Sequence, residues 1–114
     1  MKKLNVAEVI GCPSALEQDQ GDLIYNEIVS AFHKNEEISL DFVEIESIIS
    51  PFLNHAIGRL YEDYDSDFIK NHLHMEHFPK EKISTLNVVI SNAKRFYSNK
   101  DQYNHLVKEV IDNV

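Results

Sequence analysis

Four residues between positions 72 and 77 have side chains that commonly bind metal ions. His72, His74 and His77 carry imidazoles, and Glu76 adds a carboxylate. A neutral imidazole is a frequent ligand of zinc, but this spacing matches no standard metal motif. On an extended strand, His77 also has the opposite parity from the other three, so the histidines would converge only at a bend or bulge. We therefore predict no metal site and no cofactor. The alternative is a small metal-dependent or hydrolytic enzyme that uses His72, His74 and Glu76.

Two other groups of residues could support catalysis. Cys12 could form a nucleophilic pair with a distant histidine, and Asp41 with Glu44 and Glu46 could supply an acid and a base. No local feature activates the thiol, and free cysteines are usually buried. The carboxylates fall in an acidic loop, where solvated charge or a rim that faces a partner explains them. We predict that the chain is not an enzyme.

The segment 41–64 combines a strand end, a loop and a helix. We expect the helix to begin at Ser50–Pro51, with the serine as its cap and the proline at its first position. The apolar residues behind it recur at helical spacing: Phe52, Leu53, Ala56, Ile57, Leu60, Tyr61 and Tyr64. Gly58 indicates close packing against another element, and Arg59 a surface ion pair. The exposed start of this helix is the leading candidate for a functional surface.

The rest of the chain alternates between the two kinds of periodicity. Apolar residues of both parities predict a strand over 4–10 that is covered on both faces, and alternating patterns predict strands over 37–43 and 72–78. Apolar stripes predict a helix that starts near Gly21 and another that follows Pro79. We expect this second helix to break at Asn99–Lys100 and a last helix to cover 101–114. This order predicts an α/β fold with a small mixed, partly parallel sheet of three to four strands and helices packed on it. Functional groups in such folds gather at the carboxyl ends of the strands.

Composition limits the partners and the compartment. With 114 residues, the chain is long enough for one domain over 1–114, and its net charge of −8 opposes binding to nucleic acid or anionic membranes. Cys12 is the only cysteine, which fits a reducing cytoplasm. No apolar stretch approaches the roughly 18 residues of a membrane span. We expect a cytoplasmic protein that binds another protein.

The segment ISLDF, followed by a hydrophobic loop and SPFLNHAIGRLY, resembles the STAS-like domain family, whose better-known relatives are bacterial anti-sigma-factor antagonists. The upstream segment GDLIYNEI is similar to the family's first-helix entry, and the likeness covers roughly Val6 to Ile90. The resemblance implies a small α/β module without cofactor that binds protein partners. These are often histidine-kinase-like ATPases that act as serine kinases.

The sequence departs from the family at the phosphorylated site. Phosphorylated members have an Asp-Ser-Ser-Gly type of segment at the start of the corresponding helix and usually modify the second serine. Here Ile49, Ser50, Pro51 and Phe52 fill these positions, so Pro51 stands where the acceptor would be. Ser50 is still a candidate phosphoacceptor, because phosphate at a helix start would meet free N–H groups. The alternative is that Ser50 only caps the helix.

These observations predict one docking edge. We expect a regulatory partner to bind at the start of the 51–64 helix and on the loop before it, through the following residues: Asp41, Glu44, Ser50, Pro51, Phe52 and Asn54. Asn54 could equally bond its own backbone. A third alternative is a self-associating module, in which the apolar face of the last helix (Tyr103, Leu106, Val107, Val110 and Ile111) joins two copies into a homodimer.

Overall fold

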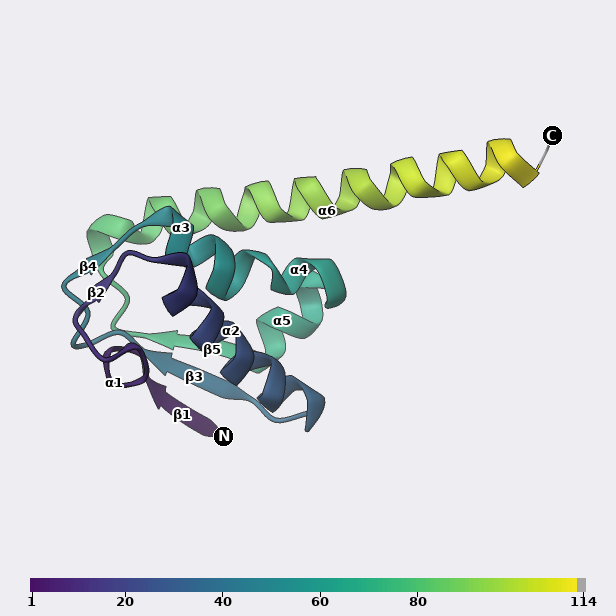
Figure 1. The fold of residues 1–114 in the computed structure, drawn as a ribbon. Coiled ribbons are helices and arrows are strands. Elements are labelled where there is room, and N and C mark those ends of the chain that lie inside the picture. Colours follow the sequence, from purple (N-terminus) through teal and green to yellow (C-terminus); the bar gives the residue numbers. More distant parts are fainter. Residues whose placement is uncertain (113–114) are drawn as a thin grey trace.

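Parallel strands form the base of the structure. A computed structural model describes the backbone of residues 1–112 and the side chains of residues 1–98. Its main sheet contains β1 (Lys2–Asn5), β3 (Ile38–Asp41) and β5 (Leu73–Glu76), in the order β1-β3-β5 with both pairs parallel (Figure 1). A second parallel pair joins β2 (Ser14–Ala15) to β4 (Ser47–Ile48). The predicted α/β fold with a small, partly parallel sheet of three to four strands is therefore confirmed, and both strand pairs of the main sheet are parallel.

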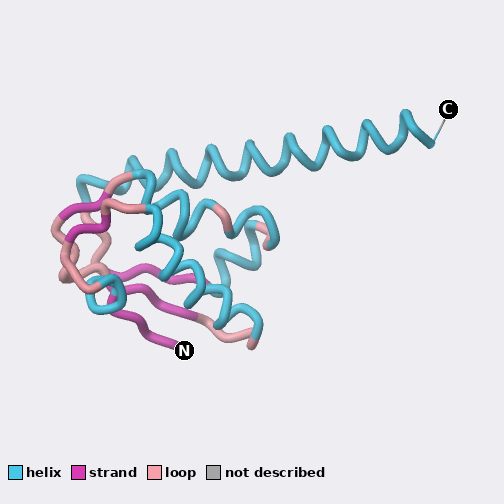
Figure 2. Tube along the Cα trace, in the orientation of Figure 1, coloured by secondary structure: helices cyan, strands magenta, loops and turns pink. Residues whose placement is uncertain are grey.

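Helices lie on one side of the main sheet, as Figure 2 shows. They are α1 (Val6–Ile10), α2 (Gln18–His33), α3 (Ser50–Leu53), the π-helix η1 (Asn54–Gly58), α4 (Leu60–Asp63), α5 (Ser66–His72), the 3₁₀-helix η2 (Lys80–Lys82) and α6 (Ile83–Asp112). The first part of α6 packs on α3, η1 and α4, and its later part extends past the other elements (Figure 1). No helix in the described part of the chain is both long enough and apolar enough to cross a membrane.

The core lies between the sheet and the layer formed by α2, α3 and η1. Its largest fully buried side chains include Ile24 and Ile28 of α2, Ile38 and Leu40 of β3, and Phe42, Phe52, Leu53 and Ile57. These positions agree with the predicted stripes of α2 and of the 51–64 helix. Leu23 follows Gly21 and would belong to the same apolar stripe of α2 by its spacing, but it is 48% exposed.

The first predicted strand, over 4–10, is wrong from Val6 onward. Only residues 2–5 are extended, and Val6–Ile10 form α1. The side chain of Asn5 accepts a hydrogen bond from the Glu8 N–H at 3.2 Å and caps this helix. Gly11 ends it in the left-handed conformation, with φ of 80°, which glycine adopts without a steric penalty. The local cap signals outweigh the mixed apolar pattern.

Two helix starts also differ from the prediction. Helix α2 begins at Gln18 rather than near Gly21, because Glu17 and Gln20 form a capping box in which each side chain pairs with the other residue's backbone. Helix α5 was not predicted at all. Asp65 caps it by accepting from the Phe68 N–H at 2.8 Å, so His72 ends a helix and does not begin the third strand.

The long helix α6 differs from the prediction at its far end. It continues through Asn99–Lys100 to Asp112 without the predicted break. The apolar face predicted for 101–114 lies outside the residues whose side chains are described. Val89 and Ala93, from the predicted stripe of the earlier part, are buried.

Candidate functional site

The start of α3 is close to its predicted position, but its cap is different. Ile49 is the cap residue, with φ of −130° and ψ of 166°, and Ser50 and Pro51 occupy the first helical positions. No side chain caps this helix. The reading that Ser50 only caps the helix is therefore wrong, and its exposed side chain makes no recorded bond to the helix end.

The loop before α3 has a fixed backbone. The N–H groups of Glu46 and Ile49 donate hydrogen bonds to the carbonyl oxygens of Pro13 and Ala15, at 2.8 and 3.2 Å. Val43, before the first anchor, and Ile49, at the second, present apolar side chains to solvent, because they are 57% and 39% exposed. Glu44 and Glu46 are exposed beside them. The loop thus offers apolar and acidic groups on a backbone that needs little ordering on binding.

The predicted contact residues at the start of this helix differ in their exposure to solvent. Phe52 is fully buried and belongs to the core, so its prediction as a partner contact is wrong. Pro51 is half-buried. Asn54 is exposed one turn after Ser50, and these two residues line one side of a groove against α6. The accessible part of the predicted edge is therefore the loop with Ser50 and Asn54.

The groove itself was not predicted. Its volume is about 340 Å³, and the wall opposite Ser50 and Asn54 belongs to α6: Ser84, Thr85, Val88, Val89 and Asn92. A neighbouring hollow of about 360 Å³ shares Asn54 and Asn92 and reaches Arg59 and Tyr97. The groove is lined by hydroxyl and amide groups together with the apolar side chains of Val88 and Val89. No sequence pattern indicates it, because it arises only where α6 crosses α3 and η1.

The middle of the predicted 51–64 helix is a π-turn. The N–H of Arg59 bonds the carbonyl oxygen of Asn54 five residues earlier, at 3.1 Å. π-Turns inside helices are rare and frequently lie at functional sites. The expectation of one regular helix is therefore wrong in its central turn.

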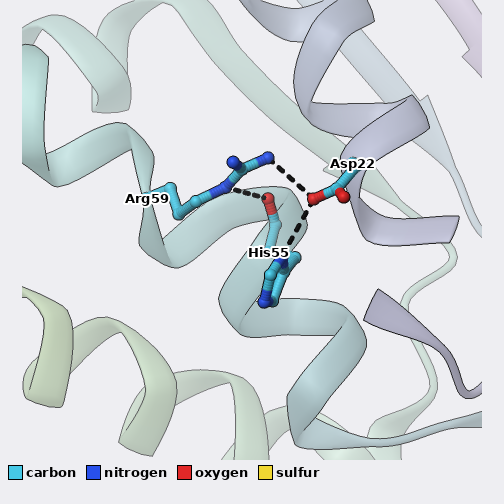
Figure 3. A network of polar contacts seen from close by, with 3 residues as sticks. All are labelled: Asp22, His55 and Arg59. Atoms are coloured by element: carbon cyan, nitrogen blue, oxygen red, sulfur yellow. Dashed lines mark hydrogen bonds and ion pairs between the residues drawn. The ribbon is translucent and has the colours of Figure 1, made fainter. Parts of the chain in front are cut away.

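A polar network joins this π-turn to α2 (Figure 3). One carboxylate oxygen of Asp22 lies 2.8 Å from His55 Nδ1 and 2.9 Å from a guanidinium nitrogen of Arg59. Arg59 Nε also donates to the His55 carbonyl oxygen at 3.1 Å, and its guanidinium lies 3.9 Å from the centre of the Tyr25 ring. Burial raises the pKa of Tyr25, and the Arg59 charge acts in the opposite direction. The ion pair predicted for Arg59 is confirmed, with Asp22 as its partner.

Gly58 faces α6, as its prediction as a packing residue requires. A Cβ at Gly58 would meet Val89 at 3.7 Å and Ala93 at 3.8 Å, which are ordinary van der Waals distances. The position therefore touches α6 and still has room for a methyl group. The tighter helix contact lies at Gly21, which the sequence analysis did not single out.

Asp41 lies at the carboxyl end of β3, as predicted. It accepts hydrogen bonds from the Val43 N–H at 2.9 Å and is 3.0 Å from His77 Nδ1. These bonds, chiefly the one with His77, lower the pKa of the Asp41 carboxyl. Glu76 ends β5 directly opposite Asp41 in the sheet register.

The metal site proposed as an alternative is not assembled. His72 stacks on the Phe68 ring with centroids 3.9 Å apart, and its Nε2 lies 3.1 Å from the Asn35 side-chain oxygen. His74 pairs with Glu37 at 2.7 Å. Since each imidazole has its own partner, His72 and His74 do not converge with Glu76.

The predicted alternative of a nucleophilic Cys12 also lacks the histidine that would activate the thiol. The Cys12 sulfur lies 3.3 Å from the Ser14 carbonyl oxygen and 3.3 Å from Gln20 Nε2. Neither group is a base that could remove the thiol proton. The structure gives no support to a cysteine–histidine pair in the described part of the chain.

The fold and these surfaces define a small α/β protein with a parallel sheet, helices on one side and exposed polar groups at strand and helix ends. The model of a family described as "STAS-like domain of unknown function (DUF4325)" matches residues 20–82, and the chain belongs to this family. The match includes the loop, α3 and the π-turn, and the predicted resemblance is confirmed. No curated protein and no solved structure gave a significant match.

Proposed function

We propose that this chain is a non-catalytic protein-interaction module of the cytoplasm that binds a regulatory partner through its docking surface. This surface comprises the loop 43–49 with Ser50 and Asn54. The observation that carries the proposal is the exposure of Val43 and Ile49 on a loop whose backbone bonds Asp41 and Phe42 at its start and Pro13 and Ala15 at its end. Binding there removes apolar area from water and costs little loop entropy.

The charges of the docking surface indicate the chemistry of the partner. Glu44 and Glu46 are exposed on either side of Ile45, in a chain of net charge −8. A partner with an apolar patch beside Lys or Arg side chains would be complementary. The family resemblance suggests a histidine-kinase-like ATPase as this partner.

Ser50 offers a route to regulation of this contact. Its exposed hydroxyl lies in the first turn of α3, beside the exposed Ile49. A phosphate there would add about −1.5 to −2 charges next to the apolar side chain of Ile49 and would disfavour binding. Pro51 has no N–H, so the helix start supplies one donor fewer for a phosphate. We therefore propose phosphorylation of Ser50 as a negative switch.

Site-specific cross-linking in the native cell tests the docking surface. The photoreactive residue p-benzoyl-phenylalanine replaces Ser50 in one sample and Ser30, an exposed serine of α2, in a matched control. We expect one protein to be cross-linked from position 50 and not from position 30. Addition of Ser50→Asp or Asn54→Lys in affinity capture should reduce recovery of that protein, whereas Ser30→Asp should not.

The same experiment can contradict the proposal. Equal cross-linking from positions 30 and 50, or equal recovery with all three substitutions, would show that this surface does not bind the partner. Circular dichroism of each variant establishes that the fold is retained. The partner's identity then shows whether it is an ATPase of the expected type.

A further inference from the structure

Two carboxylates and one imidazole converge at the carboxyl end of the main sheet. Asp41 ends β3, Glu76 ends β5 and His77 follows directly. One ligand atom from each of these side chains lies within 4.8 Å of the corresponding atoms of the other two. This is the one such group of three found in the part of the chain that the structure describes.

The backbone explains why these three residues meet. Asp41 and Glu76 are paired in the register of neighbouring parallel strands, and the Phe42 N–H donates to the Glu76 carbonyl oxygen at 3.0 Å. Strand alternation would place His77 on the other face of the sheet. His77 instead has φ of 55°, a left-handed conformation that is uncommon outside glycine, and its Nδ1 comes 3.0 Å from Asp41 Oδ1.

Neighbouring groups orient both carboxylates. Ser39 is only 3% exposed, and its hydroxyl donates to Glu76 Oε1 at 3.1 Å. The Val43 N–H donates to Asp41 Oδ1 at 2.9 Å. Hydrogen bonds of this kind hold the carboxylates of metal sites in position. Each carboxylate keeps a second oxygen that has no recorded hydrogen bond in the described part of the chain.

The charges of the cluster favour a cation. Two carboxylates directly opposite each other on neighbouring strands repel. A divalent ion would neutralise both. Oxygen donors alone would suit magnesium or calcium, whereas the added imidazole nitrogen suits zinc and its neighbours in the first transition row.

We propose that Asp41, Glu76 and His77 form a binding site for Zn²⁺, with water in the remaining coordination positions. The side chains of Asp41 and His77 are 33% and 61% exposed, so the ion is accessible from solvent. This ligand set differs from the His72, His74 and Glu76 set of the sequence analysis. The proposal is independent of the docking surface, because it depends on the sheet edge alone.

Calorimetric titration of tag-free protein with zinc chloride tests the site. His77→Asn removes the imidazole and keeps a residue that tolerates the left-handed conformation. Asp41→Asn is a second variant, and His74→Asn is the matched control on the same strand. We expect one Zn²⁺ per chain, an at least tenfold weaker Kd in both site variants, and an unchanged Kd in the control. Magnesium chloride should give no heat of binding.

Histidine ring signals in NMR spectra identify the ligand directly. With substoichiometric Zn²⁺, the signals of His77 should shift before those of the other histidines. Equal shifts at several histidines, a stoichiometry other than one, or the same loss of affinity in His74→Asn as in His77→Asn would mean an adventitious ion only. Any of these results overturns the proposal.

Discussion

Gly21 of α2 lies directly against the backbone of Phe52 in α3. A Cβ at Gly21 would be 2.6 Å from the Phe52 carbonyl oxygen and 2.8 Å from the His55 Cβ, both closer than real side chains approach. The first turn of α2 and the helix that begins at Ser50 can therefore meet only because residue 21 has no side chain. This contact sets the distance between the two helices.

Gly21→Ala should lower the free energy of unfolding by about 1–3 kcal/mol, because the backbone of α3 must move away. Gly58→Ala is the matched control. The Cβ of alanine at position 58 would lie 3.5 Å from its nearest neighbour, the side-chain oxygen of Asn54. This substitution should raise the free energy of unfolding by up to about 1 kcal/mol. Urea unfolding measures both values. If Gly21→Ala is as stable as Gly58→Ala, the close helix approach is wrong.

Asp22→Asn and Arg59→Lys should each lower the free energy of unfolding by about 0.5–1 kcal/mol, because these side chains are more than one-third exposed. The two losses have different causes. Asp22→Asn removes a charge, so its effect should shrink in 1 M salt. Arg59→Lys keeps the charge and loses the Nε bond to His55 and the contact with Tyr25, so its effect should persist. Equal salt dependence of both variants would contradict this division.

Phe52→Ala should lower the free energy of unfolding by about 3–5 kcal/mol, because the side chain is fully buried. Val43→Asp should change stability by no more than about 0.5 kcal/mol, since Val43 is 57% exposed. If the proposed docking surface binds the partner, the Val43→Asp variant should nevertheless recover less of the partner in affinity capture. Thermal unfolding and affinity capture, measured on the same samples, separate the two roles. A folded Val43→Asp variant with full recovery would remove Val43 from the surface.

Replacement of His77 by asparagine should raise the pKa of Asp41 toward its ordinary value of 3.8, because the main cause of the lowered pKa is the bond with His77. A pKa lowered by folding stabilises the native state above the unfolded pKa, and this contribution disappears as pH falls through the folded pKa. The native protein should therefore lose this contribution at a pH below 3.8. Carboxyl ¹³C titration in the presence of a chelator measures the shift. If the Asp41 pKa is unchanged in the variant, the hydrogen bond from the Val43 N–H, and not the one with His77, is the cause of the lowered pKa.

Periodicity predicted the elements with strong apolar patterns and missed those set by polar caps. The core positions of β3, β5 and the 51–64 helix follow their apolar residues. Asn5 and Asp65 instead start helices through single side-chain hydrogen bonds, and Glu17 does so through a capping box with Gln20; no periodic pattern contains these bonds. The π-turn was also unpredictable, since one extra residue in a turn leaves the apolar stripe intact.

The candidate sites were predictable only in part. The loop, Ser50, Asn54 and Asp41 come from one continuous segment, so the sequence could place them together. The convergence of His77 with Asp41 depends on the positive φ angle of His77. It also depends on the pairing of Asp41 with Glu76, which lie 35 residues apart in the sequence. The groove depends on the crossing of α6. Neither relation is encoded in local spacing.

The long helix α6 begins just after the segment that the family model matches, and it divides the chain's charge. Residues 1–82 contain 7 basic and 16 acidic side chains, whereas residues 83–114 contain 4 basic and 3 acidic ones. The entire excess of negative charge therefore belongs to the body that residues 1–82 form. A positively charged molecule diffusing nearby is drawn toward the faces of this body that α6 leaves open, and salt weakens that attraction. The part of the helix that packs on α3, η1 and α4 carries only the basic side chains Lys94 and Arg95, so it adds nothing to this attraction.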